Sequence, residues 1–214
     1  MDKIKALLFD LDGVIVSTEK NHFHAWQKTA QKLGIDFREE QNEELKGVNR
    51  VDSLKKILSF GNLKVSKQVF EQLLSFKNEV YLESIRNLNR KDLLPGVLNL
   101  LNEAKSNRLK IGLGSSSKNA RLILELLELT DLFDVIIDGN SVTYPKPHPE
   151  VFLNGAQLLG LSPKQCLVFE DAASGIQAAK DGGFYAIAVG NKTIETLADL
   201  YIEDLTNFTL VNYA

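Results

Sequence analysis

The stretch that decides the fold is Ala6-Leu7-Leu8-Phe9-Asp10-Leu11-Asp12-Gly13, near the start of the chain. A mainly apolar segment that begins at Ile4 stops there at two aspartates and a glycine. Short apolar runs of this kind are typical of strands buried on both faces of a parallel sheet, and Asp-Gly favours a turn. We therefore predict a first strand over residues 4–9 that is closed by a turn.

Four more apolar runs follow along the chain, and each comes after a segment with helical spacing. The segment from Val97 to Ala104, for example, has apolar residues at i, i+3, i+4 and i+7. Because parallel strands are joined through crossover helices, this alternation predicts an α/β fold, a doubly wound parallel sheet with helices on both faces and a Rossmann-like core. The further strands are expected at residues 111–114, 135–137, 166–169 and 186–189.

Residues 17–88 follow a different pattern, because apolar residues keep helical spacing there and no β-branched run appears. This pattern predicts a helical-bundle cap domain, inserted after the first strand into a core formed by residues 1–16 and 89–214. The expected buried positions of the cap are Phe23, Trp26, Ala30 and Leu33, then Val51, Leu54 and Leu58, then Val69, Leu73, Phe76 and Val80.

The composition of the 214-residue chain is that of a folded globular protein, with 44% hydrophobic and 25% charged residues. A net charge of −3 provides no basic field for nucleic acid or for an anionic membrane. The single cysteine, Cys166, cannot form an internal disulfide, which fits a reducing compartment. We find no signal peptide and no membrane span, and we expect a cytoplasmic monomer with no nucleic-acid or membrane partner.

Polar residues follow the predicted strands, and ligands of open parallel sheets bind at the carboxyl ends of the strands. Asp10 and Asp12 follow the first strand, and their spacing of two directs both carboxylates to one side. The other strand ends carry Ser115-Ser116-Ser117 ahead of a helix, Lys146 between two prolines, and Glu170-Asp171. The helix start offers free N–H groups to an anion. These groups are expected to meet in one site.

Four clustered carboxylates repel each other, by about 4 kcal/mol per pair at 4 Å and an effective dielectric constant near 20. The cluster therefore needs cations to remain ionised. Ligation by oxygen alone suits Mg²⁺, which accepts a substrate phosphate as one of its ligands. Together with Lys146, Mg²⁺ would allow an anionic carboxylate to approach a phosphorus atom, so the pattern indicates phosphoryl transfer.

Four motifs in this order, Phe9-Asp10-Leu11-Asp12-Gly13-Val14, Ser115, Lys146-Pro147 and Glu170-Asp171, resemble those of the haloacid dehalogenase superfamily. The resemblance covers nearly the whole chain. It implies that Asp10 is the nucleophile, which forms an aspartyl phosphate, and that Asp12 is the general acid and base. It also implies one Mg²⁺ per subunit, bound by Asp10, the main-chain carbonyl of Asp12, Glu170 and Asp171.

Further segments resemble the sugar-phosphate mutases of this superfamily, namely 12–15, 22–26, 45–50 and 115–119. That resemblance implies interconversion of β-D-glucose 1-phosphate and glucose 6-phosphate, with glucose 1,6-bisphosphate as the priming intermediate. The implied residues that bind the sugar phosphate are His22, Trp26, Lys46, Gly47, Val48, Arg50, Ser115, Ser116, Ser117, Lys118, Asn119 and Lys146. Ser17 and Ala172 depart from the residues common in the superfamily, an Asp and a Ser.

Two other functions share the motifs of the core. The first is a Mg²⁺-dependent sugar-phosphate or phosphoglycolate phosphatase, in which water attacks the aspartyl phosphate. The second is a catalytically silent binding module on the same fold. Simpler roles are also expected for some residues: Ser115 to Ser117 could cap the next helix, Lys77, His24 and His148 are expected to be solvated, and Cys166 is expected to be inert in the core.

Overall fold

The computed structural model describes residues 3–45 and 48–212. The chain divides into two compact units, one formed by Met1–Ser17 with Leu88–Ala214 and the other by Thr18–Asn87. These are called the core unit and the cap unit below. The boundaries lie one residue from those expected from the change in hydrophobic pattern.

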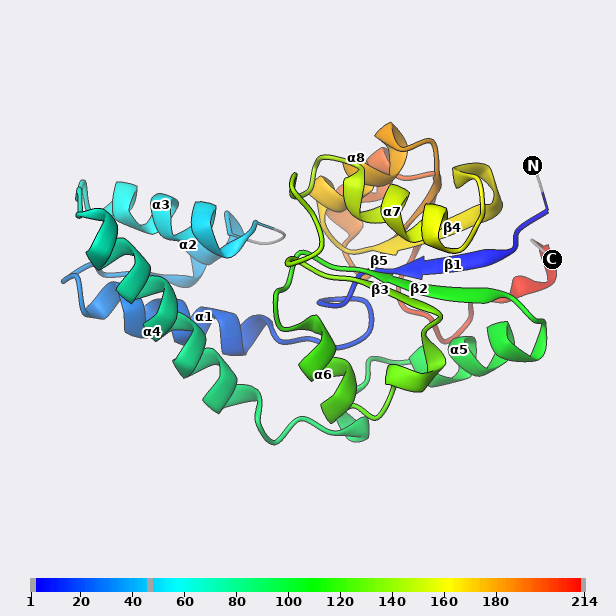
Figure 1. Cartoon of the computed structure of the whole chain (residues 1–214), viewed down its shortest axis with the longest axis horizontal. Helices are drawn as coiled ribbons and strands as arrows, with labels where there is room; N and C mark the ends of the chain where they lie inside the picture. The colour runs from blue at the N-terminus through cyan, green and yellow to red at the C-terminus, as the bar shows by residue number, and fades with distance from the viewer. Residues whose placement is uncertain (1–2, 46–47, 213–214) are drawn as a thin grey trace. The chain divides into compact units, whose positions relative to one another are not determined.

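The core unit contains a six-stranded parallel sheet in the order β3-β2-β1-β4-β5-β6 (Figure 1). The strands are β1 (Ala6–Phe9), β2 (Lys110–Gly114), β3 (Val135–Ile137), β4 (Cys166–Glu170), β5 (Tyr185–Val189) and β6 (Leu200–Ile202). The predicted α/β class with a doubly wound parallel sheet is confirmed. The sequence did not indicate β6, because this edge strand is only three residues long and half-buried.

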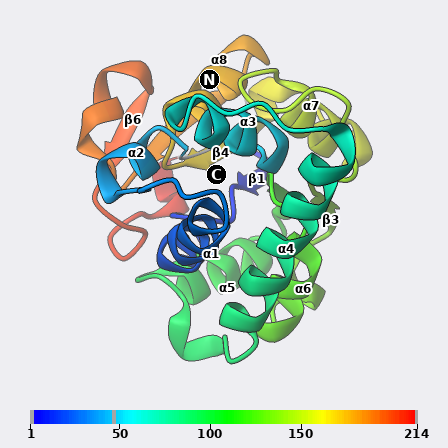
Figure 2. The same cartoon turned by 90° about the vertical axis from the view of Figure 1, so that its left-hand side faces the viewer.

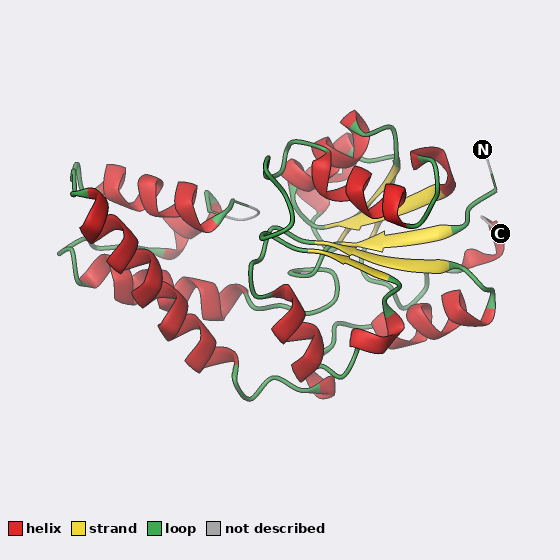
Figure 3. Cartoon of the chain, in the orientation of Figure 1, coloured by secondary structure: helices red, strands yellow, loops and turns green. Residues whose placement is uncertain are grey.

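Helices cover both faces of this sheet, with α7 (Glu150–Leu158) and α8 (Ala173–Asp181) on one face (Figures 1 and 3). The helices α5 (Val97–Ser106) and α6 (Ala120–Leu126) lie on the other face. Short 3₁₀ helices occur at Arg90–Asp92, Thr130–Leu132, Pro163–Gln165, Lys192–Leu197 and Leu210–Asn212. Within the described residues, no helix has the length and apolar character needed to cross a membrane.

Strand β1 is buried on both faces, as its uninterrupted apolar sequence predicts. Ala6 and Leu8 pack in the hydrophobic cluster with residues of α7 and α8. The ring of Phe9 stacks on that of Phe169 in the neighbouring strand β4, with centroids 4.8 Å apart. Successive residues of β1 therefore pack on opposite faces of the sheet. This packing holds the strand in place and so fixes the position of Asp10, the residue that follows it.

All the strands that the structure describes lie in the core unit, and the cap unit is helical (Figures 2 and 3). Its helices are α1 (Glu19–Gln31), α2 (Glu39–Glu43), α3 (Arg50–Phe60) and α4 (Lys67–Ile85). Their core contains Trp26, Ala30, Phe37, Leu45, Leu54, Ile57, Leu58 and Leu73. The five-residue helix α2 was not predicted, since it is too short to show a period in the sequence.

The predicted buried face of α4 is partly wrong. Val69 is 39% exposed, whereas Leu73, Lys77, Tyr81 and Ile85 form a buried row at intervals of four. The hydrophobic pattern places Lys77 on the polar side of this helix and predicts a solvated side chain, which is wrong. Its long apolar stem can be buried when the ammonium group finds polar or aromatic partners, and that is the case here.

Candidate active site

The centre of the candidate site is the ammonium group of Lys146. Its Nζ donates a hydrogen bond to Asp10 Oδ1 at 2.5 Å and a second to Glu170 Oε1, and all three side chains are buried. Phe9 and Phe169 are paired in register between β1 and β4, and Asp10 N donates to Phe169 O at 2.9 Å. The carboxyl ends of these two neighbouring strands therefore bring Asp10 and Glu170 to the same lysine.

Burial changes the ionisation of this cluster. It raises the pKa of Asp10 to about 7, an effect that Lys146 reduces and Glu170 and Asp12 increase. Burial, together with the charges of Glu170, Asp10 and Asp12, raises the pKa of Asp171 to about 9. Burial alone would lower the pKa of Lys146, but the negative charges of Asp10 and Glu170 raise it overall. The cluster thus carries more negative charge than one lysine neutralises.

The turn after β1 brings Asp12 and Asp171 close to Asp10. Gly13 has a φ of +80° and donates its N–H to Val16 O at 2.8 Å, which closes the turn. A Cβ atom at this position would overlap Asp171 Oδ2. Glycine is required here both for the positive φ and for the approach of the second carboxylate.

The donors at this site fit Mg²⁺, because they are carboxylate and carbonyl oxygens of Asp10, Asp12, Glu170 and Asp171. In residues 3–45 and 48–212, however, no three acidic, histidine or cysteine side chains converge as a ready-made metal site. The hydrogen bonds of Lys146 draw Asp10 and Glu170 toward its ammonium group. The excess of buried negative charge indicates that a second cation belongs here.

The loop after β2 holds the predicted serines. Ser115 is buried, and its Oγ accepts a hydrogen bond from Ser117 N at 3.1 Å. Ser117 Oγ in turn accepts one from Asn119 N at 3.2 Å. The serine hydroxyls thus use N–H groups that the sequence analysis left free for an anion, and α6 begins only at Ala120. Lys118 is exposed, and Ser116 and Asn119 are half-buried.

The predicted sugar-phosphate residues of the cap unit differ in accessibility. Arg50 opens α3 and is half-buried, and burial lowers its pKa. Val48 is 36% exposed. Trp26 is only 3% exposed within the cap core, as its helical spacing predicts, and its contact with substrate stays a prediction. Lys46 and Gly47 lie outside the described residues.

His22 has partners within the cap unit that the sequence did not predict. Its Nδ1 lies 2.7 Å from Lys77 Nζ, and its ring lies 4.2 Å from that of Tyr81. The hydroxyl groups of Tyr81 and Thr18 are hydrogen-bonded at 2.9 Å. A lysine ammonium group can only donate, so His22 Nδ1 accepts and the proton of the neutral ring is on Nε2. The sequence feature that indicates a buried Lys77 is its position in the row of residues 73, 77, 81 and 85, which lie four apart along α4.

The predictions for the remaining polar residues are mostly confirmed. His24 and His148 are exposed. Cys166 is buried in β4, and burial raises the pKa of its thiol to about 12, so the thiol is inert near neutral pH.

The strand-end cluster of Asp10, Lys146, Glu170 and Asp171 is the arrangement expected for phosphoryl transfer on an α/β core. The chain belongs to the haloacid dehalogenase-like hydrolase family, whose model matches residues 4–183. Membership in this family implies dependence on Mg²⁺.

Among its relatives, beta-phosphoglucomutase of Bacillus subtilis is 41% identical over 209 residues, which cover 97% of this chain and 92% of the relative. A crystal structure of beta-phosphoglucomutase from Clostridium difficile superposes with a TM-score of 0.93 at 41% identity, covering 96% of this chain and 93% of that one. A phosphorylated carbohydrates phosphatase of Thermotoga maritima is 32% identical over 189 residues, covering 86% of this chain and 84% of the relative.

Proposed function

We propose that this protein is a phosphomutase that interconverts β-D-glucose 1-phosphate and glucose 6-phosphate. The observation that carries the proposal is the 41% identity to beta-phosphoglucomutase over 97% of the chain. The buried contact of Asp10 with Lys146, beside Glu170 and Asp171, supports phosphoryl transfer as the chemistry. We further propose that the enzyme acts as a cytoplasmic monomer.

In the first half-reaction, the phosphoryl group on Asp10 is transferred to the sugar. The 6-hydroxyl oxygen of β-glucose 1-phosphate attacks phosphorus, the bond from phosphorus to the Asp10 carboxylate breaks, and the Asp12 carboxylate takes the hydroxyl proton. Lys146 holds the Asp10 carboxylate and offsets the charge that it regains. The product of this step is glucose 1,6-bisphosphate.

In the second half-reaction, the bisphosphate is bound in the opposite orientation. The Asp10 carboxylate attacks the phosphorus of the 1-phosphate, the bond to the C1 oxygen breaks, and Asp12 returns its proton to that oxygen. Glucose 6-phosphate leaves and Asp10 is phosphorylated again. Mg²⁺, held by Asp10, the carbonyl of Asp12, Glu170 and Asp171, supplies positive charge for the phosphoryl oxygens when bound.

A phosphatase is the second candidate, because a sugar-phosphate phosphatase relative is 32% identical over 86% of the chain. In that reaction water replaces the sugar hydroxyl, and no subsite for a second phosphate is needed. The mutase proposal assigns that subsite to Arg50, Lys118 and Asn119, and it counts His22, Lys46, Gly47 and Val48 among the other residues that bind the sugar phosphate. Arginine suits this role because its guanidinium group binds two phosphate oxygens at once.

The deciding experiment measures both products in one reaction. The protein is incubated with β-glucose 1-phosphate, Mg²⁺ and a trace of glucose 1,6-bisphosphate, and glucose 6-phosphate is compared with released phosphate. We expect glucose 6-phosphate to exceed phosphate, whereas predominant release of phosphate would overturn the mutase proposal. The Asp10→Asn variant is the control for contaminating enzymes, since it lacks the nucleophile and should yield neither product.

A further inference from the structure

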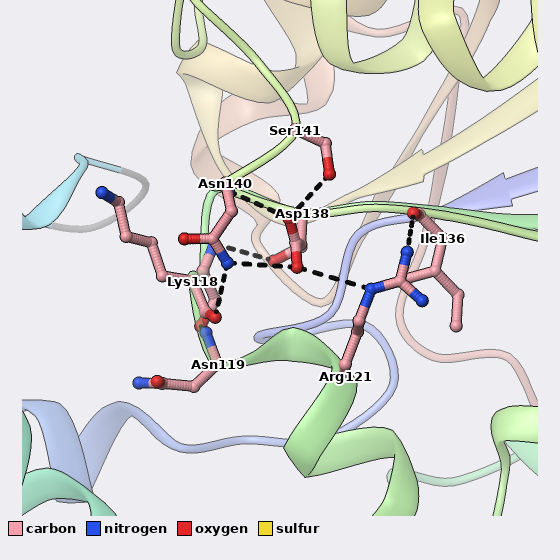
Figure 4. Close-up of polar contacts among 9 residues, drawn as sticks. Lys118, Asn119, Arg121, Ile136, Asp138, Asn140 and Ser141 are labelled. Atoms are coloured by element: carbon pink, nitrogen blue, oxygen red, sulfur yellow. Dashed lines mark hydrogen bonds and ion pairs between the residues drawn. The ribbon is translucent and has the colours of Figure 1, made fainter.

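A third buried carboxylate, Asp138, lies directly after β3 and is not part of the site described above. It is 3% exposed. Its Oδ1 accepts hydrogen bonds from Asn140 N at 2.9 Å and from Ser141 Oγ at 2.8 Å. Its Oδ2 accepts from Asn140 Nδ2 at 3.3 Å and lies 3.7 Å from Arg121 Nε (Figure 4). One carboxylate thus organises the whole turn of residues 138–141.

The charge of Asp138 is stabilised in this position. Burial by itself would raise the pKa of Asp138, but the hydrogen bonds from Ser141 and Asn140 and the charge of Arg121 lower it overall. Arg121 also donates from Nη2 to Ile136 O at 2.9 Å, which connects α6 to β3 (Figure 4). The turn is therefore attached to α6, the helix that follows the loop of residues 115–119.

The same turn holds the backbone of the loop of residues 115–119. Asn140 Nδ2 donates to Lys118 O at 3.0 Å, and Gly139 N donates to Ser117 O at 3.1 Å. The side chains of Lys118 and Asn119 both point away from Asp138 (Figure 4). Two consecutive carbonyls of the loop are thus bound from behind, while the side chains predicted to bind phosphate remain directed outward.

Gly139 is a further sign of this close approach. A Cβ atom at this position would overlap Ser116 O and would lie 3.1 Å from the carbonyl carbon of Ser116. Any larger residue would push the turn and the loop apart. The glycine is needed here for contact between two backbones, since its own φ is not among the positive values.

We propose that Asp138, Gly139 and Asn140 are positioning residues for the sugar phosphate. They fix the backbone of residues 116–118, so that Lys118 and Asn119 are already ordered when the phosphate arrives. Ordering a loop before binding removes an entropic cost from the binding step, and that gain appears as affinity. The inference rests on the proposed function in one respect, that Lys118 and Asn119 bind a sugar phosphate.

The test compares two substitutions of Asn140 with a matched control. Asn140→Ala removes both donated bonds, and Asn140→Leu removes the same donors but keeps nearly the same size and the backbone bond to Asp138, without adding a charge beside that carboxylate. Asn107→Ala is the control, because Asn107 Nδ2 also donates to a backbone carbonyl, Glu103 O at 2.9 Å, at the end of α5. Michaelis constants for β-glucose 1-phosphate, kcat and the melting temperature are measured for each variant.

We expect both Asn140 variants to raise KM about threefold to tenfold, because each loses one or two hydrogen bonds that order the loop. Their kcat should stay within about twofold of wild type. Gly139→Ala should lower kcat/KM by up to about 10²-fold, because it displaces the loop directly. Asn107→Ala should leave KM unchanged. Asn140→Leu should not restore KM, which separates the donated hydrogen bonds from side-chain packing.

The proposal is overturned if KM of both Asn140 variants equals that of Asn107→Ala, or if Asn140→Leu restores the wild-type value. If Asn140→Ala does not fold, Asn140→Leu and Gly139→Ala still decide between these outcomes. Failure of the proposed function has a different signature, since the wild-type protein would then release phosphate in place of glucose 6-phosphate. The KM comparison is valid for either reaction.

Discussion

Among the residues that the structure describes, each unit buries one lysine, and the two lysines have different partners. In the core unit, Lys146 is 7% exposed and is bonded to the carboxylates of Asp10 and Glu170. In the cap unit, Lys77 is 2% exposed, with its Nζ beside His22 Nδ1 and 4.9 Å and 4.6 Å from the ring centroids of Trp26 and Tyr81.

The different partners of Lys146 and Lys77 indicate different roles for the two ammonium groups. Hydrogen bonds between ionised groups in a buried site are about twice as strong as neutral ones, and charged groups there act directly on reacting atoms. A cation over aromatic faces gains about 0.5–2 kcal/mol and acts mainly on packing. We therefore expect Lys146 to be required for chemistry, and Lys77 to be required chiefly for the shape of the cap and the orientation of His22.

The largest expected effect comes from removing Mg²⁺, since Lys146 alone does not neutralise the carboxylates of the core. Excess chelator should reduce isomerisation and the hydrolysis of acetyl phosphate at least about 10³-fold, and added Mg²⁺ should restore both. Product formation and phosphate release are measured in parallel. Full turnover in excess chelator would contradict the assignment of Asp10, Glu170 and Asp171 as ligands.

The next largest effect is expected from replacing each buried lysine by methionine, the same substitution in both units. Lys146→Met should lower the hydrolysis of acetyl phosphate by at least about 10³-fold, because it removes a charge from the reacting carboxylate. Lys77→Met should lower it less than about tenfold, since a thioether packs well against aromatic rings. Melting temperatures verify that both proteins fold, and equal losses in rate would show that the two lysines do not differ as described.

A smaller effect, limited to one reaction, is expected from Arg50 of the cap unit. Arg50→Ala should lower isomerisation of glucose 1-phosphate by at least about 10²-fold and hydrolysis of acetyl phosphate less than about tenfold, because acetyl phosphate has no second phosphate to bind. Arg86→Ala is a suitable control, since Arg86 is exposed and pairs with Glu83. Equal losses in both reactions would assign Arg50 a structural role.

The smallest expected effect is on the free energy of unfolding, and it compares one aspartate of each unit in place of the two lysines. Burial opposes ionisation of Asp134 in the core unit, but hydrogen bonds from Ile111 N, Lys110 and Lys105 lower its pKa overall. A pKa depressed by folding contributes stability above the unfolded value near 4, and this stability is lost as the pH falls through the folded pKa. Asp134→Asn should therefore cost about 1 kcal/mol at pH 7 and less below pH 4.

Urea unfolding at several pH values measures this contribution. The matched variant in the cap unit is Asp52→Asn, because hydrogen bonds from Lys55 and Asn49 lower the pKa of Asp52, whose side chain is 48% exposed against 22% for Asp134. Solvent screening should limit its effect to below about 0.5 kcal/mol. A loss for Asp134→Asn that does not change with pH would show that its charge contributes nothing.

Much of the core could be predicted because its information is local. An apolar run followed by Asp10 identifies both a buried strand and the position of a carboxylate at its end, and the same logic found Lys146 and Glu170. The sequence did not indicate a role for Asp138, although Asp138-Gly139-Asn140 also follows a strand. Asp, Gly and Asn are common in ordinary turns, and the loop that these residues hold is about 20 residues earlier in the chain, so no local pattern connects the two.

The errors in the cap have a different cause. Hydrophobic spacing placed Val69 in the core and Lys77 in the solvent, because it counts a lysine as polar whatever its neighbours are. The structure buries Lys77 against rings and an imidazole supplied by α1 and α4. His22 and Trp26 are distant from Lys77 in sequence, so no local pattern identifies them as its partners. The serine hydroxyls of the loop after β2 are a different case, because they bond N–H groups only two residues along the chain, close to the capping role that the sequence also allows.

The register of β1 and β4 has a consequence for tolerance to insertions. Because Phe9 is paired with Phe169, the separation of Asp10 and Glu170 is inherited from the repeat of the backbone ladder, about 4.8 Å between adjacent strands. This spacing does not depend on the length of the segment of about 160 residues between the two strands. Insertions in surface loops leave this spacing intact, whereas a shift of one residue within β4 would turn Glu170 to the opposite face of the sheet.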